Sequence, residues 1–409
     1  MTNHVRIRKP RNPATATDLA SRTDLASRTD LATNTDLPEA EDLTDQCVIN
    51  GYTISQHLDQ MRDRKNKTFW TSQLVNGAHQ VLITPPEGKL VYGVVVKWRT
   101  DPMPFAVQEK NESGEWITVA EAPGQFNEQY LALPRGVGEF RIVNAVSPRN
   151  RLKICELIII GEGRLPDRVH VWQEPPEEVD MLLIAGHPDD EILWFGGLLP
   201  YYAGERGKSV LVATAAYNIY YRKLELLDCL WTCGIRIYPH FLGYEDFVTA
   251  NVTYTLNRWG GNRCFRDVTL LYRKYRPLVV VLQDTKGEYG HGIHKAVSIL
   301  GQTAVSYAAD PNKYPFDLQK YPVWDVPKVY VHLYKENQIT MDWHVPLEHF
   351  GGITAQDVAR KAYKCHVSQQ HKEYYSVQDG GPYDNSLFGL FHTTVGPDVI
   401  GGDMFENLE

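Results

Sequence analysis

The chain has 409 residues, which is enough for two or three domains with buried cores. Its apolar share of 43% and its charged share of 22% are ordinary for a soluble globular protein. The formal net charge of −8 argues against nucleic acid or an anionic membrane as a partner, because neither attracts an acidic surface. The longest apolar runs, Met181–Ala185 and Leu278–Leu282, are far shorter than the about 18 residues of a transmembrane segment.

The N-terminal stretch Met1–Asn12 carries basic residues but no apolar run behind them, so no secretory signal is predicted. The six cysteines follow neither a disulfide framework nor a paired C-x-x-C spacing. We therefore expect reduced thiols and a cytoplasmic location. Cys229 and Cys233 lie four residues apart in a predicted helix, a spacing typical of packing residues.

An Asp-Leu pair recurs every six residues from Asp18 to Leu43, in units that read TDLASR, TDLASR, TDLATN and TDLPEA. A period of six matches neither a helix nor a strand, and one leucine per unit is too little to build a core. We therefore predict that residues 1–46 form a disordered tail without a chemical role.

Short alternating apolar runs separated by turn residues fill residues 47–163, and they predict an antiparallel β-sandwich. The clearest runs are Leu90–Thr100, Phe105–Glu109, Trp116–Ala120, Phe140–Ala145 and Leu152–Gly161. The order of the pieces Phe69-Trp70-Thr71, Lys97-Trp98 and Gly114-Glu115-Trp116 before a closing ELIIIG strand resembles discoidin and galactose-binding-like modules. This resemblance implies carbohydrate binding, although tryptophans in a sandwich are usually core residues.

Residues 164–178 are rich in proline and are interpreted as a linker, after which strands and helices alternate over residues 179–409. The apolar runs Asp180–Ala185 and Leu278–Leu282 are typical of parallel strands buried on both faces. Two further strands are expected at Ser209–Ala215 and Val329–Leu333. Apolar stripes indicate two helices, at Leu224–Trp231 and Ile293–Ala304. The alternation predicts an α/β fold with a Rossmann-like, doubly wound, mostly parallel sheet.

The first strand of this predicted sheet runs into Ala185-Gly186-His187-Pro188-Asp189-Asp190-Glu191. Ligands of open α/β sheets bind at the carboxyl ends of the strands. The acidic cluster would repel a phosphate, and no G-x-G-x-x-G motif is present, so a nucleotide site is not expected. Imidazole and carboxylate together favour a divalent metal, whereas the structural alternative is an acidic cap on the next helix.

A second polar segment, Asp284–His294, follows the strand Leu278–Leu282 and ends in Gly290-His291-Gly292-Ile293-His294. It occupies the same strand-to-helix position as the first cluster, so its histidines should reach the same edge of the sheet. His294 would complete a triad of two histidines and one aspartate that leaves a position open for water, as catalytic zinc sites do. We therefore expect one catalytic metal centre built from both segments.

The A-x-H-P-D-D-E motif followed about a hundred residues later by G-E-Y-G-H-x-x-H resembles the PIG-L/LmbE family of zinc-dependent de-N-acetylases. The likeness covers most of residues 179–300. It implies removal of the acetyl group from an N-acetylated amino sugar of the N-acetylglucosamine type. By this resemblance, zinc, with ferrous iron as the alternative, is held by His187, Asp190 and His294.

The same resemblance assigns the other roles. Asp189 is the implied general base, His291 the acid and stabiliser of the intermediate, and Tyr289 the group that polarises the carbonyl. Arg222 and Asp246 are the implied sugar contacts. Physically, zinc lowers the pKa of bound water to about 7, and an adjacent carboxylate that is not a ligand can take the proton.

This chain departs from the family pattern between its two histidines, where Gly292-Ile293 stands in place of Pro-Asp. That aspartate would orient His291, and we consider Glu288 or Asp284 as substitutes. Pro200 falls in the helix after the first motif, and it is tolerated if that helix begins near Gly197. Farther on, Thr354-x-x-Asp357 predicts the start of a helix.

His366, which follows the helix predicted from Thr354, is a weaker candidate for the lining of a sugar pocket, since a histidine at a helix end is more often a capping or surface residue. Two other functions remain open. One is a non-catalytic carbohydrate-binding protein, and the other is the same chemistry on a thiol-sugar conjugate or an antibiotic glycoside. The sequence does not separate these acceptors, and it leaves the oligomeric state undetermined.

Overall fold

The computed structural model describes residues 37–51, 57–370 and 375–408. The chain divides into two compact units, and each is described separately. The first holds the residues up to Val96 together with Met103–Gln125 and Tyr130–Val169, and the second holds Lys97–Pro102, Phe126–Gln129 and His170–Glu409. Every helix among the described residues is too short or too polar to span a lipid bilayer.

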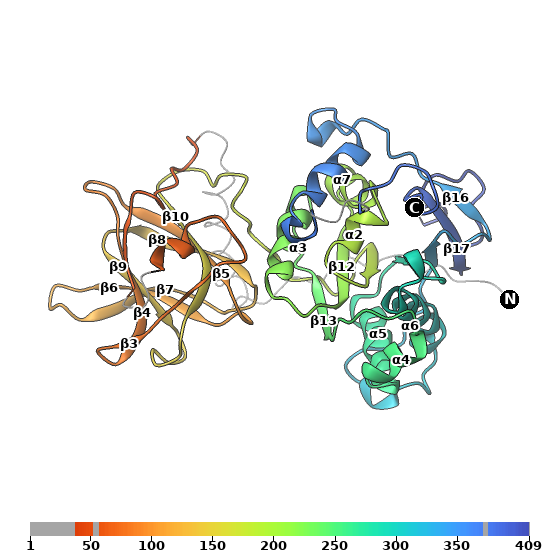
Figure 1. The fold of residues 1–409 in the computed structure, drawn as a ribbon, viewed down its shortest axis with the longest axis horizontal. Coiled ribbons are helices and arrows are strands. Elements are labelled where there is room, and N and C mark those ends of the chain that lie inside the picture. Colours follow the sequence, from red (N-terminus) through yellow and green to blue (C-terminus); the bar gives the residue numbers. More distant parts are fainter. Residues whose placement is uncertain (1–36, 52–56, 371–374, 409) are drawn as a thin grey trace, which may run out of the picture. The chain divides into compact units, whose positions relative to one another are not determined.

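Two sheets dominate the first unit, and the predicted strands of residues 47–163 all form (Figure 1). One sheet has the order β1-β4-β9-β6-β7 with β3 paired to β4, and the other has the order β2-β10-β5-β8. Their bounds are β1 (Val48–Asn50), β2 (Trp70–Thr71), β3 (Leu74–Val75), β4 (Ala78–Thr84), β5 (Val91–Trp98), β6 (Phe105–Lys110), β7 (Trp116–Ala122), β8 (Glu128–Val137), β9 (Phe140–Asn144) and β10 (Lys153–Ile160), with a short helical turn η1 (Leu58–Met61). Trp70 and Trp98 are each 1% exposed, so both are core residues.

Residues 37–46 correct the prediction of a free tail over residues 1–46. Leu43 is 1% exposed, and its N–H donates to the carbonyl of Ile159 at 2.8 Å. Ala40 is also buried and bonds the carbonyl of Arg164. The end of the repeat region therefore contributes buried apolar side chains to the first unit, because its backbone bonds to β10 and to the residues that follow β10. The other repeats, in residues 1–36, lie outside the described residues.

The second unit contains one sheet in the order β13-β12-β11-β14-β15-β17-β16. The bounds are β11 (Met181–Ala185), β12 (Val210–Ala216), β13 (His240–Tyr244), β14 (Val279–Leu282), β15 (Lys328–His332), β16 (Gln338–Thr340) and β17 (Leu387–Thr393). The strands from β13 to β15 are parallel to their neighbours, whereas β17 is antiparallel to β15 and to β16. Every residue of β11 and β14 is buried, as the continuous apolar runs predicted.

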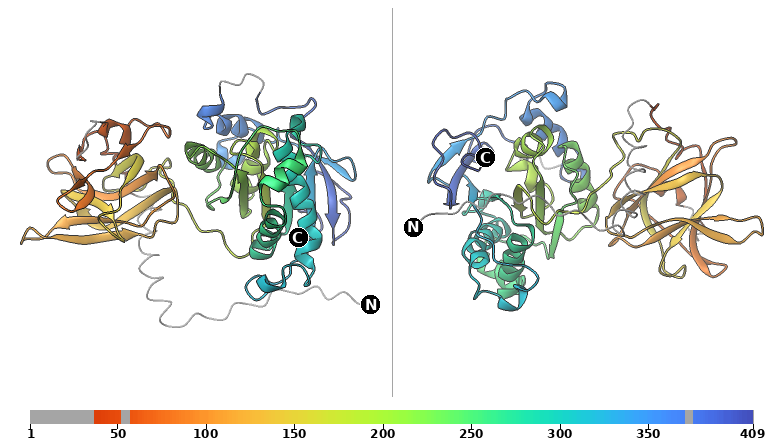
Figure 2. Two further views of the ribbon diagram at one scale, coloured as in Figure 1. Left: turned by 60° about the horizontal axis from the view of Figure 1, so that its bottom comes forward. Right: turned by 180° about the vertical axis from the view of Figure 1, so that it is seen from behind.

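Helices cover both faces of this sheet, with α2, α3 and α7 grouped on one side and α4, α5 and α6 on the other (Figures 1 and 2). Their bounds are α2 (Asp190–Leu193), α3 (Tyr221–Thr232), α4 (Val252–Arg258), α5 (Asn262–Tyr275), α6 (Gly292–Ala309) and α7 (Ala355–Tyr363). Short helical turns lie at Pro200–Glu205, Glu288–Gly290, Pro315–Asp317, Glu348–Phe350 and Val367–Gln369. Pro200 opens its turn, and Thr354 caps α7 by accepting the Asp357 N–H, as expected.

The position of β11 in the sheet determines where a site can form. Its neighbours are β12 on one side and β14 on the other, so the chain changes direction across the sheet at this strand. Parallel strands end at the same edge, and a crevice opens where the strand order switches. The segments that follow β11, β12, β13 and β14 therefore converge there.

Candidate active site

The loop after β11 carries the first cluster, and its glycine is required by close packing. A Cβ on Gly186 would lie 2.9 Å from Asp190 Oδ2 and 3.0 Å from His294 Cδ2. The Gly186 N–H donates to Gln283 Oε1 at 2.7 Å, which ties the end of β11 to the end of β14. Because a side chain cannot fit at this point, the backbone lies directly against the two clusters.

Three donor atoms from the two predicted segments converge. Asp190 Oδ2 lies 3.0 Å from His187 Nδ1 and 3.1 Å from His294 Nε2, and the two nitrogens are 3.2 Å apart. Bonds of about 2.0–2.2 Å to one tetrahedral metal ion would set such atoms about 3.3–3.6 Å apart. Shifts of a few tenths of an ångström would therefore admit a divalent metal. His187, His291 and His294 also form a group whose ligand atoms could hold a metal ion.

The Asp190 carboxylate and the two histidines beside it change one another's pKa values. Burial would raise the pKa of Asp190, but His294 and His187 beside it hold that pKa well below its ordinary value. Burial opposes the charge of His294, yet Asp190 and Glu288 raise its pKa to about 10. The Asp190 carboxylate thus lies between two imidazole rings, and carboxylate and imidazole together are donors that bind a divalent metal.

Each predicted ligand is oriented by a further side chain. Trp194 Nε1 donates to Asp190 Oδ1 at 2.8 Å. This bond leaves Asp190 Oδ2 free to face His187 and His294, and the three side chains are called the donor cluster below. Glu288 Oε2 lies 3.0 Å from His294 Nδ1, and Glu288 Oε1 lies 2.8 Å from Nδ1 of His332 at the end of β15. A carboxylate on the outer nitrogen of a metal-binding histidine sets its tautomer and orientation.

Asp189 lies next to this cluster in a strained backbone conformation, with φ 128° and ψ −26°. Its carboxylate is 2.9 Å from Arg222 Nη2, and the same guanidinium donates to the Pro188 carbonyl. Burial raises the pKa of Asp189 to about 6, against the opposing charge of Arg222. A carboxylate with a pKa close to neutrality suits a general base, and strained residues concentrate at functional sites.

Arg222 and Asp246, the predicted sugar contacts, also contact Asp189 and His187. Arg222 lies in the first turn of α3 and is 8% exposed. Asp246 follows β13, with Oδ1 3.3 Å from His187 Nε2 and Oδ2 3.8 Å from Arg222 Nη1. Both side chains reach the cavity while orienting Asp189 and His187.

Tyr289 and His291 come from the loop between β14 and α6. Tyr289 has φ 46° and is 43% exposed as a residue, while partial desolvation of its hydroxyl and the nearby Asp190 raise its pKa above the ordinary value, so the hydroxyl stays a donor. His291 Nδ1 accepts the Ile293 N–H at 3.2 Å as the cap of α6, which leaves Nε2 to carry the proton. Burial and the neighbouring His187 and His294 lower the pKa of His291 to about 4. A neutral imidazole fits the predicted stabilising role better than the predicted acid role.

The suggested substitutes for the missing aspartate contact other groups. Glu288 contacts His294 and His332, and Asp284 accepts the Lys286 N–H. The carboxylates that act electrostatically on His291 are Asp190 and Asp246.

A cavity of about 190 Å³ opens over these groups. One part of its lining is polar and consists of His187, Asp189, Asp190, Arg222, Asp246, His291 and Gln369. The other part is apolar and aromatic and consists of Leu193, Trp194, Val248, Tyr289 and Tyr375. Every predicted site residue except His294 and His366, which are both fully buried, therefore lines one cavity.

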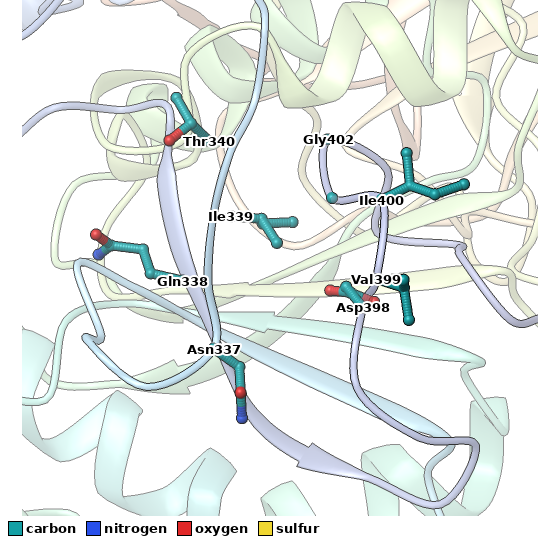
Figure 3. A pocket seen from close by; sticks show the side chains of 9 residues that line it. Asn337, Gln338, Ile339, Thr340, Asp398, Val399, Ile400 and Gly402 are labelled. Carbon is teal, nitrogen blue, oxygen red and sulfur yellow. The ribbon is translucent and has the colours of Figure 1, made fainter.

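A larger cavity of about 420 Å³ lies between β16 and residues 398–402 (Figure 3). Its one ionisable lining residue is Asp398, which pairs with Lys328 and accepts the Tyr330 hydroxyl at 2.6 Å. Since this carboxylate is already neutralised, the cavity offers no reactive group among its lining residues.

Sequence reasoning missed several groups that shape the site. Trp194 stands four residues after Asp190, so helical spacing could have found it. His332 ends an apolar strand at the same edge of the sheet as the two motifs, which was a visible signal in the sequence. His366 does not line the cavity, because it is fully buried with Nε2 2.7 Å from Glu191 Oε1. The pairing of residues 175 positions apart left no local signal.

Comparison with known proteins relates the chain to deacetylases, although no protein-family model matches it. The chain is 27% identical over 179 residues to 1D-myo-inositol 2-acetamido-2-deoxy-α-D-glucopyranoside deacetylase 1 of Catenulispora acidiphila. The matched region covers 37% of this chain and 54% of that protein. It is 31% identical over 179 residues to the corresponding deacetylase of Rhodococcus jostii, covering 37% of this chain and 60% of that protein. The chain thus spans a little over half the length of these curated relatives.

A solved structure, N,N'-diacetylchitobiose deacetylase from Pyrococcus horikoshii, is similar with a TM-score of 0.38 and 19% identity, over 49% of this chain and 74% of that chain.

Proposed function

We propose that residues 179–409 are a metal-dependent N-deacetylase that hydrolyses the acetamido group of an N-acetylglucosamine-type sugar or glycoconjugate. The observation that carries the proposal is the convergence of His187 Nδ1, Asp190 Oδ2 and His294 Nε2 within 3.0–3.2 Å of one another beside the strained Asp189. The similarity to named sugar deacetylases over 179 residues supports the same activity.

Zinc is the proposed metal, with ferrous iron as the alternative, because two imidazoles and one carboxylate suit both. When bound, a divalent metal supplies a Lewis acid for the amide carbonyl and lowers the pKa of water. The side chains supply the remaining chemistry.

Asp189, whose pKa is near 6, takes a proton from the attacking water and is placed to return it to the amine as the C–N bond breaks. The protonated Tyr289 hydroxyl and His291 Nε2–H donate to the oxygen on which negative charge develops. Acetate and the free amine leave. Arg222 holds Asp189 and, with Asp246, offers polar groups to the sugar hydroxyls.

The substrate is proposed to present one acetamido sugar to the cavity. Its volume of about 190 Å³ and its aromatic lining suit a single sugar ring better than a longer segment of a glycan. The rest of the substrate would extend past Val248, which is 95% exposed at the cavity margin. An inositol, a second sugar, a thiol-bearing group or an antibiotic could follow the reacting ring.

Acetate release tests the proposal. Purified full-length protein is assayed for bound metal and for acetate release from N-acetylated glycans, glycolipids and thiol glycosides, each with and without chelator. We expect chelator-sensitive release from at least one acetamido sugar. Sugar binding without acetate release in the zinc-loaded and iron-loaded protein would contradict the proposal and favour the non-catalytic carbohydrate-binding alternative.

We also infer that the second unit is a Rossmann-like, doubly wound domain and that residues 47–163 form a β-sandwich of the carbohydrate-binding type. Five parallel strands with helices on both faces support the first inference. For the second, Trp116 is the one tryptophan of the predicted motif that is not fully buried, and Arg141 stacks 4.3 Å from its ring. Trp116→Ala should weaken retention on immobilised glycan if the sugar contacts that face.

A further inference from the structure

A buried pair of ionisable side chains adjoins Asp189 without touching the cavity. Glu191 lies in α2 and His366 precedes the turn Val367–Gln369, and both side chains are 0% exposed. His366 Nε2 lies 2.7 Å from Glu191 Oε1. Neither residue lines the cavity, so neither is placed to touch a substrate.

The second oxygen of Glu191 holds the backbone of the proposed base. Glu191 Oε2 accepts the Asp189 N–H at 2.8 Å. The backbone of Asp189, at φ 128° and ψ −26°, lies in a region that residues with a side chain rarely adopt, and such a conformation persists only where its surroundings impose it. The Glu191 carboxylate is thus the acceptor that fixes the strained peptide.

Stability alone is a weak reason to bury this pair. Two ionisable groups removed from water lose hydration that their attraction often fails to recover, and apolar residues would serve the core as well. Glu191, His366 and Cys229 also form a cluster with ligand atoms within 4.8 Å of one another. Both oxygens of Glu191 are already engaged by His366 and by Asp189, which argues against a second metal there.

We propose that Glu191 and His366 are positioning residues that hold Asp189 in its strained conformation, with its carboxylate directed at the reacting water. This inference rests on the proposed function, in which Asp189 is the base. His366 fixes one oxygen of Glu191, Glu191 fixes the Asp189 N–H, and Arg222 separately holds the Asp189 carboxylate.

Substitutions of Glu191 that keep its size test the proposal in the full-length, metal-loaded protein. Glu191→Met removes the acceptor, and we expect kcat for acetate release to fall about 10–100-fold, the usual effect of a residue that orients a functional group. KM and the bound metal should stay unchanged, because the ligand atoms are untouched. Glu191→Gln retains an oxygen that can accept the Asp189 N–H, so it should recover most of the lost kcat.

Combining Glu191→Met with Asp189→Asn distinguishes a positioning role of Glu191 from a general structural effect. If Glu191 acts through Asp189, Glu191→Met should cause no further loss of kcat in a protein that already carries Asp189→Asn. Equal losses in both backgrounds, or a loss of metal in proportion to activity, would overturn the proposal. If Glu191→Met does not fold, His366→Gln takes its place, with a smaller loss of kcat and the same dependence on Asp189.

Glu225→Met is the matched control. Glu225 is also buried, and it bonds the N–H and the hydroxyl of Ser368 at 2.9 and 2.6 Å, in the segment that carries His366. Its two oxygens bond Ser368, whereas the Asp189 N–H is bonded by Glu191, so we expect kcat to stay within about twofold while thermal stability falls. An equal loss of kcat would show that any buried carboxylate here matters, which contradicts the proposal. Absence of acetate release in the unsubstituted protein would instead reject the proposed function.

Discussion

Asp189 and Asp190 are adjacent in sequence, but the turn after β11 gives them different surroundings. Asp190 lies against His187 and His294, whereas Asp189 is paired with Arg222. The backbone strain at Asp189 is what separates the two side chains. Two carboxylates with different partners can divide the roles of ligand and base between them.

Replacing each aspartate by asparagine should therefore give different results. Asp189→Asn should retain metal and lower kcat by about 10²–10⁴, the usual contribution of a general base. Asp190→Asn should lose metal together with activity, because an amide is a weaker ligand than a carboxylate. Metal analysis and acetate release measure both. Equal metal loss in the two variants would mean that base and ligand are wrongly assigned.

Trp194 offers a second test at the residue scale. Trp194→Phe keeps an aromatic ring but removes the N–H that Asp190 Oδ1 accepts. We expect metal affinity, measured by competition with a chelator, to fall about 10–100-fold. Trp324→Phe is the control, since Trp324 Nε1 donates to the Pro277 carbonyl away from the donor cluster. Equal affinity in Trp194→Phe and the unsubstituted protein would contradict an orienting role.

At the scale of secondary structure, the end of β11 sets the distance between the two clusters. Gly186→Ala would bring a methyl group to 2.9 Å from Asp190 Oδ2 and 3.0 Å from His294 Cδ2. Because both atoms belong to side chains of proposed metal ligands, the methyl group would displace these side chains, and we expect metal affinity to fall at least tenfold while the sheet still folds. Gly138→Ala, where no atom lies within 4 Å of the added Cβ, should leave metal binding unchanged. Metal titration compares the two variants.

The strand β13 carries a histidine that should make stability depend on pH. Burial, with a smaller effect of Lys274, lowers the pKa of His240 to about 4, below its value of about 6.5 in an unfolded chain. Between these values the unfolded state binds a proton that the folded state does not. The contribution of His240 to the free energy of unfolding is therefore fully present above about pH 6.5 and is lost as the pH falls toward 4.

Urea unfolding at pH 7 and pH 5 measures this effect. The His240 contribution should amount to about 2 kcal/mol between these pH values. His240→Gln, which stays neutral throughout, should show a loss of stability on acidification that is smaller by that amount. Identical pH dependence in the two proteins would mean that His240 is protonated in the folded state.

For the whole molecule, metal binding and folding should be linked. The ligand atoms come from the ends of β11 and β14, so the metal centre exists only in the folded sheet. A metal at a hundred times its dissociation constant should raise the free energy of unfolding by about 2.7 kcal/mol. Thermal melting of metal-free protein should therefore shift upward by several degrees on addition of zinc. Asp190→Asn should show no such shift, and an equal shift in that variant would place the metal elsewhere.

The sequence by itself determined the features that are local in the chain. Apolar runs specified β11 and β14, helical stripes specified α3 and α6, and the two strand-end motifs supplied the ligands, because local periodicity and turn chemistry act over a few residues. The tertiary structure alone decided the rest. It joined His366 to Glu191 and His332 to Glu288, placed the last repeat of the predicted tail against β10, and strained Asp189. Contacts between distant segments depend on how the whole sheet and its helices pack, and no pattern within a few residues encodes them.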